Sequence, residues 1–149
     1  MYACDWDWWA EHYEAVEKGF KGKRYTHSTE THQHANPDAG FDLNRIPGKS
    51  LPGLGKDCIH YGKNGGYQAV NLAYLLGAKT IILLGFDMMA TGHWFGDHKG
   101  RLNRPSPYHD FIAAFETINP DDYGLEIINC TRETALTCFP VVPLEKVFG

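Results

Sequence analysis

The chain has 149 residues, which is a typical length for one domain with one hydrophobic core. Its hydrophobic content of 43% and charged content of 21% are those of an ordinary globular protein, and its net charge of -4 argues against general nucleic-acid binding. No apolar run is long enough to span a membrane, and the acidic, aromatic start MYACDWDWW is not a signal peptide. We therefore expect one cytoplasmic domain over residues 1–149, without a membrane partner.

The first part of the chain predicts few regular elements. Residues 2–4 (YAC) have the composition of a strand end, and residues 7–20 carry apolar side chains at helical spacing. Residues 24–28 (RYTHS) predict a short strand. Residues 29–56 are rich in Thr, His, Asn, Pro and Gly, which predicts a loop with at most a short strand near residues 41–44. So long a loop indicates either a functional segment or an unrecognised element.

From residue 57 onward, predicted strands and helices alternate. We expect strands at residues 57–62, 79–86 and 125–130, and helices at residues 66–77, 108–118 and 143–149. This alternation indicates right-handed βαβ units and therefore an α/β fold with a mainly parallel sheet. The run KTIILLGF at residues 79–86 is apolar on both faces, which is typical of a central strand covered by helices.

A glycine turn between the first of these strands and its helix is a candidate anion-binding site. Glycines let a ligand approach the backbone, and the N–H groups at a helix start attract anions. No acidic residue occurs between Asn64 and Lys79, although a first helical turn usually contains Asp or Glu. We interpret Asn64, Gly65, Gly66 and Gln68 as ligand-binding candidates. The alternative is a tight turn that needs glycine only for steric reasons.

Polar residues also follow two of the predicted strands. In open α/β sheets, ligands bind beyond the carboxyl ends of the strands, which is where Asp87 lies. Its carboxylate is suited to holding a sugar hydroxyl, acting as a base or binding a metal; the alternative is a capping or turn role. Asn129 and Thr131 end the strand at residues 125–130, and we expect them to line the same pocket with polar groups.

The segment GHWFGDHKGRLNR contains further candidates for chemistry. His93, Asp97 and His98 are residue types that bind metals, but their spacing does not define a complete metal site, so we predict none. The preferred interpretation is a loop in which His93 or His98 transfers a proton. Lys99, Arg101 or Arg104 would then contact a phosphate.

Three segments, IHYGKNGGYQAVNLAYLLGAKTIILLGFDM, HWFGDHKGRLNRPSPY and EIINCTRETALTCFP, together resemble a family of phage and prophage proteins. Some members of that family carry a morphogenesis-type ("norphogenetic") label. The chain is more distantly similar to 6-hydroxymethylpterin diphosphokinase-like proteins with flagellin-modifying motility accessory factors, and to a family of bacterial sialyltransferases. In those proteins a Rossmann-like domain binds a nucleotide or diphosphate donor.

The resemblance implies a Rossmann-like three-layer fold with its donor site at residues 64–66 and its Gly-x-Asp motif at Gly85 and Asp87. The sialyltransferases use a histidine as general base, and loop position would assign that role to His93 or His98. Relatives usually begin with an additional strand and an Asn-Gly-Pro-Ser-like phosphate loop, before the segment where this chain starts. We therefore expect the first strand to be missing, leaving a sheet edge through which a homo-oligomer forms.

Together, these patterns predict a phage-encoded Rossmann-like protein in the host cytoplasm that binds a nucleotide or nucleotide-sugar ligand. As an enzyme it would be a glycosyl- or diphospho-transferase, and no further cofactor is predicted. The alternative is a non-catalytic phage protein for assembly or host interaction, with the histidine loop as a partner surface. A second alternative is a metal-dependent hydrolase that uses His93, Asp97 and His98.

Overall fold

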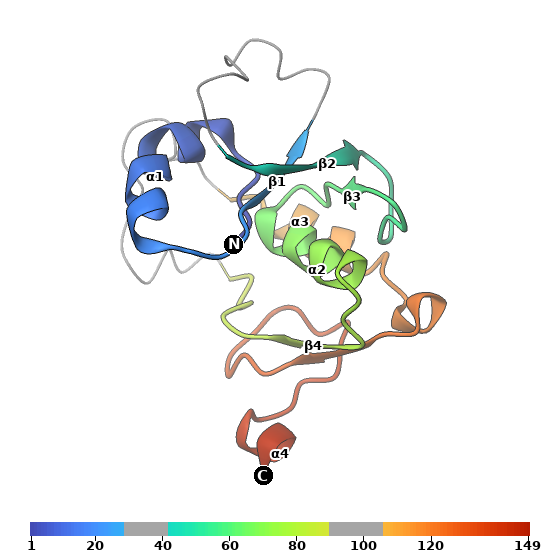
Figure 1. Cartoon of the computed structure of the whole chain (residues 1–149). Coiled ribbons are helices and arrows are strands. Elements are labelled where there is room, and N and C mark those ends of the chain that lie inside the picture. Colours follow the sequence, from blue (N-terminus) through green and yellow to red (C-terminus); the bar gives the residue numbers. More distant parts are fainter. Residues whose placement is uncertain (29–41, 90–105) are drawn as a thin grey trace.

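A computed structural model describes residues 1–28, 42–89 and 106–149 of the chain (Figure 1). Helices and strands are mixed in these segments, and every paired strand runs parallel to its neighbour, as the α/β class predicts. The strands form two small sheets, one with three strands and one with two. The finer expectation of a three-layer Rossmann-like domain stays a prediction. Within the described ranges, no helix combines the length and the apolar character that a membrane crossing requires.

The first sheet contains β1 (Tyr25–Ser28), β2 (Asn44–Lys49) and β3 (Ile59–His60), in that order. The strand expected at residues 24–28 is confirmed, but the one expected near residues 41–44 instead begins at Asn44. Asn44 donates its N–H to Arg24 O, so the even-numbered residues of β2 bond toward β1. The nitrogen of Pro47 therefore faces the other side, where pairing with β3 begins only at Gly48. A proline fits there because no N–H is needed.

Helix α1 (Trp6–Gly19) confirms the predicted first helix and packs beside this sheet (Figure 1). Trp9 is fully buried, and its Nε1 donates a hydrogen bond to Ala3 O at 3.0 Å. The Tyr13 hydroxyl accepts a hydrogen bond from the N–H of Asp42 at 2.8 Å. Two aromatic residues four positions apart thus tie one face of α1 to the amino-terminal segment and to the approach to β2.

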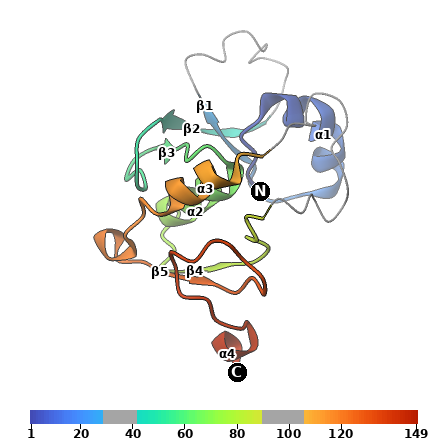
Figure 2. The same cartoon turned by 180° about the vertical axis from the view of Figure 1, so that it is seen from behind.

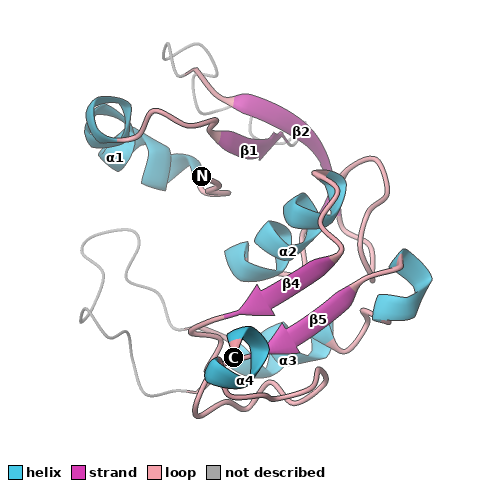
Figure 3. Ribbon diagram, turned by 60° about the horizontal axis from the view of Figure 1, so that its bottom comes forward, coloured by secondary structure: helices cyan, strands magenta, loops and turns pink. Residues whose placement is uncertain are grey.

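Helix α2 (Gly65–Leu75) leads from the first sheet to β4 (Thr80–Leu83), which pairs with β5 (Glu126–Asn129) in the second sheet. Figure 3 shows α2 between the two sheets. Glu126 N–H bonds to Lys79 O, so the backbone groups of Thr80 and Ile82 point away from β5. Among the described residues no strand pairs with that edge. In the described part of the chain, β4 is therefore an edge strand and not the central strand that its apolar run predicts.

The main hydrophobic core lies where α2 and α3 (Tyr108–Phe115) cover one face of the second sheet (Figure 2). Phe115 is fully buried and makes edge-to-face contacts with Tyr67, Phe86 and Phe139. The chain then passes through a short 3-10 helix, η3 (Pro120–Tyr123), before β5 and ends in helix α4 (Glu145–Phe148). Figures 1 and 2 show α4 on the opposite side of the second sheet from α2 and α3.

Candidate functional site

The start of α2 is built by a sharp turn with two left-handed residues. Gly62 has φ 49° and Lys63 has φ 60°, and the Tyr67 ring leaves no room for a Cβ at Gly62. Asn64 then caps the helix, because its Oδ1 accepts the N–H of Tyr67 at 2.8 Å. Its Nδ2 donates to Gly62 O at 3.0 Å. Both ends of the Asn64 side chain therefore fix the turn that exposes the first turn of α2.

Gly65 and Gly66 provide the backbone donors of this first turn. In the segments that the structure describes, no acceptor contacts either N–H, and the first turn contains no acidic residue. A Cβ on Gly66 would lie 2.9 Å from the Phe86 ring, whereas a Cβ on Gly65 would lie 3.7 Å from Cys4 Sγ. The helix start thus has one neighbour from the amino-terminal segment and one from the loop after β4. Its donors and its dipole suit an anion.

The ammonium group of Lys63, beside this turn, forms an ion pair with another residue of the protein. Lys63 Nζ lies 3.0 Å from Asp110 Oδ2 on α3, and this hydrogen bond lowers the pKa of the Asp110 carboxyl. His109 Nε2 lies 3.0 Å from the other carboxylate oxygen of Asp110. An anion at the helix start would therefore depend on the Gly65 and Gly66 amides more than on Lys63.

Gln68 lies one turn further along α2 and is only 5% exposed. Its Nε2 donates to Tyr61 O at 2.9 Å, and its Oε1 accepts the Tyr2 hydroxyl at 2.6 Å. The Tyr2 hydroxyl also lies 3.2 Å from His27 Nδ1, and burial raises the pKa of Tyr2 well above its usual value. Gln68 thus joins three chain segments beside the turn. We predicted Gln68 as a ligand contact and missed Tyr2 and His27.

The loops after β4 and β5 leave the same edge of the second sheet, as expected, since Leu83 pairs with Asn129 in parallel register. Thr131 Oγ1 accepts the N–H of Phe86 at 2.9 Å. Asn129 is fully buried and its Oδ1 accepts the N–H of Thr131 at 3.0 Å, so it supports the loop from within. Asp87 is partly exposed. Of the three predicted ligand contacts at this edge, only Asp87 and Thr131 are partly exposed, and their contact with a ligand stays a prediction.

The remaining predicted site residues lie outside the described part of the chain: His93, Asp97, His98, Lys99, Arg101 and Arg104. Their predicted roles in proton transfer and phosphate contact stay predictions. Within residues 1–28, 42–89 and 106–149, no group of three or more His, Cys, Asp or Glu side chains is arranged to hold a metal ion.

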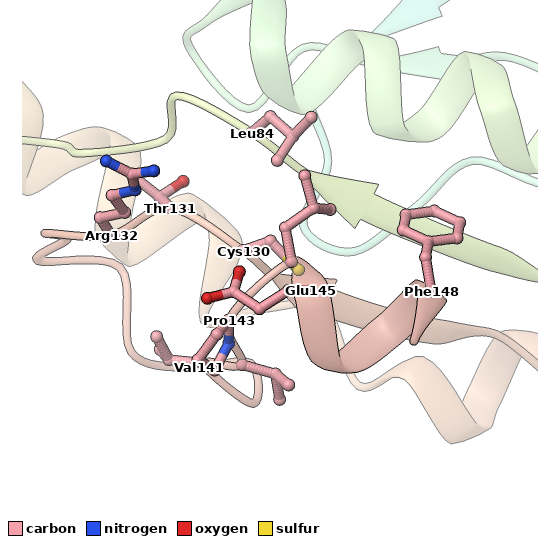
Figure 4. Close-up of a pocket in the computed structure, with 10 residues that line it drawn as sticks. Leu84, Cys130, Thr131, Arg132, Val141, Pro143, Glu145 and Phe148 are labelled. Carbon is pink, nitrogen blue, oxygen red and sulfur yellow. The ribbon is translucent and has the colours of Figure 1, made fainter.

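A pocket of about 740 Å³, which we did not predict, lies on the outer face of the second sheet (Figure 4). Side chains alternate along a strand, so Leu84 faces away from the core that holds Leu83. Leu84, Val141 and Phe148 are 57%, 48% and 73% exposed, and all three line the pocket. The other lining residues are Cys130, Thr131, Arg132, Val142, Pro143, Leu144 and Glu145. This pocket is largely apolar, unlike the helix start.

These features define an α/β protein with small parallel sheets, an uncompensated helix start at their carboxyl-end edge and an apolar pocket on the outer face. No protein-family model, no curated protein and no solved structure matches the chain. The resemblance to phage proteins and to nucleotide-dependent transferases therefore stays a prediction that depends on the sequence motifs.

Proposed function

We propose that this chain is a Rossmann-like protein that binds a nucleotide or nucleotide-sugar ligand and acts as a glycosyl- or diphospho-transferase. The observation that carries the proposal is the first turn of α2, where Gly65 and Gly66 present two N–H donors and the turn itself contains no acidic residue. A phosphate group accepts hydrogen bonds from such donors and is stabilised by the helix dipole.

The surroundings of the helix start determine which charge a ligand meets. Burial and the nearby Asp5 raise the pKa of the Cys4 thiol to about 12, so Cys4 is neutral near pH 7 and does not itself repel a phosphate. The Asp5 carboxylate lies 3.5 Å from Cys4 Sγ and opposes an anion on that side, so binding depends on the amide donors and the helix dipole. Asp87 follows Phe86, whose ring contacts Gly66, so its carboxylate is suited to orienting a ligand hydroxyl. In this proposal, His93 or His98 moves a proton and Arg101 or Arg104 offsets the charge of the leaving group.

Replacing Gly65 with aspartate should weaken anion binding without lowering the stability of the fold. The new carboxylate would complement the helix dipole and add about 0.3–1 kcal/mol of stability. It would repel a phosphate by about 1–4 kcal/mol, which lowers nucleotide affinity roughly fivefold or more. Isothermal titration with CMP, CDP, UDP, GDP and ATP measures this effect.

The matched control is Gly65→Ala, whose Cβ would lie at an ordinary contact distance of 3.7 Å from Cys4 Sγ. We expect this variant to bind the same nucleotide as the wild-type chain with similar affinity. Two results would contradict the proposal: none of the five nucleotides binds the wild-type chain, or the aspartate and alanine variants bind equally well.

A second candidate function is non-catalytic assembly, and the apolar outer face is the observation that favours it. Exposed apolar side chains that gather at one place often mark a protein interface. The edge of β4 that has no partner among the described strands adds a second surface suited to pairing between copies. On this candidate the chain forms a homo-oligomer or binds another protein of its assembly.

Phe148→Ser tests the assembly candidate. Phe148 is 73% exposed, and burying such a side chain between copies contributes about 1.5–3 kcal/mol, so the variant should weaken self-association by roughly tenfold or more. Sedimentation velocity over a range of concentrations measures the association, and Lys146→Ser on the same helix serves as the control. A wild-type chain that stays monomeric throughout, or equal behaviour of the two variants, would remove the homo-oligomer form of this candidate.

A further inference from the structure

The outer face of the second sheet is apolar and incompletely covered. Ile81 and Ile127 belong to the core, so their neighbours Ile82 and Ile128 face the outer side. These two isoleucines pair across β4 and β5, and both are partly exposed. Parallel sheets are normally covered on both faces. In the described ranges, the helix on this side is the four-residue α4, so apolar surface stays open to solvent.

Two opposite charges flank the pocket on this outer face. Arg132 and Glu145 both line the pocket, and both are exposed. Figure 4 shows Arg132 beside Thr131 at one end of the pocket and Glu145 on α4. In the part of the chain that the structure describes, neither charged side chain takes part in an ion pair or a hydrogen bond. An apolar centre with a charged rim is the usual arrangement of a protein interface.

The same face contains both a cation and an anion without partners, so two copies of it complement each other. A twofold axis brings one patch against its own copy, so that residue i meets residue j and residue j meets residue i. One contact between Arg132 and Glu145 across such an axis therefore creates a second, identical contact. Phe148, which is 73% exposed, projects from the same patch and would be covered at the same time.

We propose that this outer face is the interface of a twofold dimer of the chain, in which Arg132 pairs with Glu145 of the partner subunit. Leu84, Val141 and Phe148 form the apolar centre of that interface. The inference rests on the assembly candidate, whose surface it shares, and it names a second copy as the partner. It does not depend on nucleotide binding.

A second copy explains the charges of this face better than an unrelated partner does. An unrelated protein would have to supply an anion for Arg132 and a cation for Glu145 at matching positions. A second copy supplies both from one surface, because like charges are kept apart and opposite charges meet. Closing the interface also removes Leu84, Val141 and Phe148 from water, which stabilises the dimer.

Charge reversal in the full chain tests the pairing. Arg132→Glu and Glu145→Arg each place like charges opposite one another twice per dimer, so each should raise the dissociation constant of the dimer roughly tenfold or more. The double variant restores opposite charges and should recover an affinity close to that of the wild-type chain. Sedimentation velocity over a range of concentrations, at low ionic strength where charges are least screened, measures the four constants.

The matched control is Glu133→Arg, which makes the same charge change as Glu145→Arg. Glu133 is exposed and adjacent to Arg132 but does not line the pocket, so its reversal should leave the dissociation constant nearly unchanged. Circular dichroism checks that each variant folds. If one reversal variant does not fold, comparison of the other single reversal with Glu133→Arg decides.

Three results would overturn the proposal. A wild-type chain that stays monomeric at every concentration removes both the dimer and the homo-oligomer form of the assembly candidate. A dimer that neither reversal weakens, or that the double variant does not restore, forms through another surface such as the free edge of β4. Native mass spectrometry that shows a monomer with a small molecule or another protein bound would assign the face to that occupant. Nucleotide titration of the same variants tests the transferase proposal separately.

Discussion

Replacing Asn71 with leucine is expected to lower the free energy of unfolding by about 3–6 kcal/mol, because it leaves three buried backbone groups without partners. Asn71 is fully buried on α2. Its Oδ1 accepts the N–H groups of Gly55 and His60, at 2.9 and 2.8 Å, and its Nδ2 donates to Gly55 O at 3.0 Å. Leucine has the same number of side-chain heavy atoms and the same branch at Cγ but makes none of these hydrogen bonds.

Such a loss is large against the total stability of about 5–15 kcal/mol that is usual for a domain. Urea unfolding followed by circular dichroism measures it. Ala69→Leu is the matched control, because Ala69 is an exposed residue on the same helix and leucine is a good helix former. A loss below about 1 kcal/mol for Asn71→Leu would show that water or a local shift satisfies the three groups.

Phe115→Ala should lower the free energy of unfolding by about 3–5 kcal/mol, as is usual when a buried phenylalanine leaves a cavity. Phe115 is fully buried, and its ring centroid lies 5.3 Å from that of Tyr67, 5.8 Å from that of Phe86 and 6.2 Å from that of Phe139. Removing the ring deletes these edge-to-face contacts between α3, α2 and the loops that follow β4 and β5.

The same urea experiment compares Phe115→Ala with Phe111→Ala, which truncates a partly exposed phenylalanine on the same helix. Phe111→Ala should lower the free energy of unfolding much less, because truncating a partly exposed ring leaves a site open to water rather than a closed cavity. Equal losses at the two positions would contradict the placement of Phe115 at the centre of the core.

The helices and the second sheet were largely predictable, because their apolar residues recur at regular spacing. Strand β2 was not predictable, because residues such as Pro47 and Gly48 normally interrupt strands. The structure tolerates Pro47 because pairing with β3 begins only at Gly48, so no N–H is needed at Pro47. The central position expected for β4 was also wrong for the described part of the chain. Apolar faces indicate burial, but the number of neighbouring strands depends on pairing partners that one strand does not encode.

For the candidate site, the Asn-Gly-Gly sequence was sufficient to locate the start of α2 to within one residue, but the cap that Asn64 forms was not predicted. The contacts of Tyr2 with His27 and Gln68 span 25 and 66 residues of sequence, so no local pattern indicates them. The outer pocket was missed for a related reason: it forms only when the segment around Val141 folds back beside Leu84.

The first turn of α2 contacts segments that belong to both sheets, and this has a mechanical consequence. Gly65 is next to Cys4 from the side of the first sheet, whereas Gly66 contacts Phe86 from the side of the second. A small rotation of one sheet about the axis of α2 would change the separation of Cys4 and Phe86 while leaving the hydrogen bonds within each sheet intact. A molecule bound at the helix start, in contact with both Cys4 and Phe86, would then oppose this rotation.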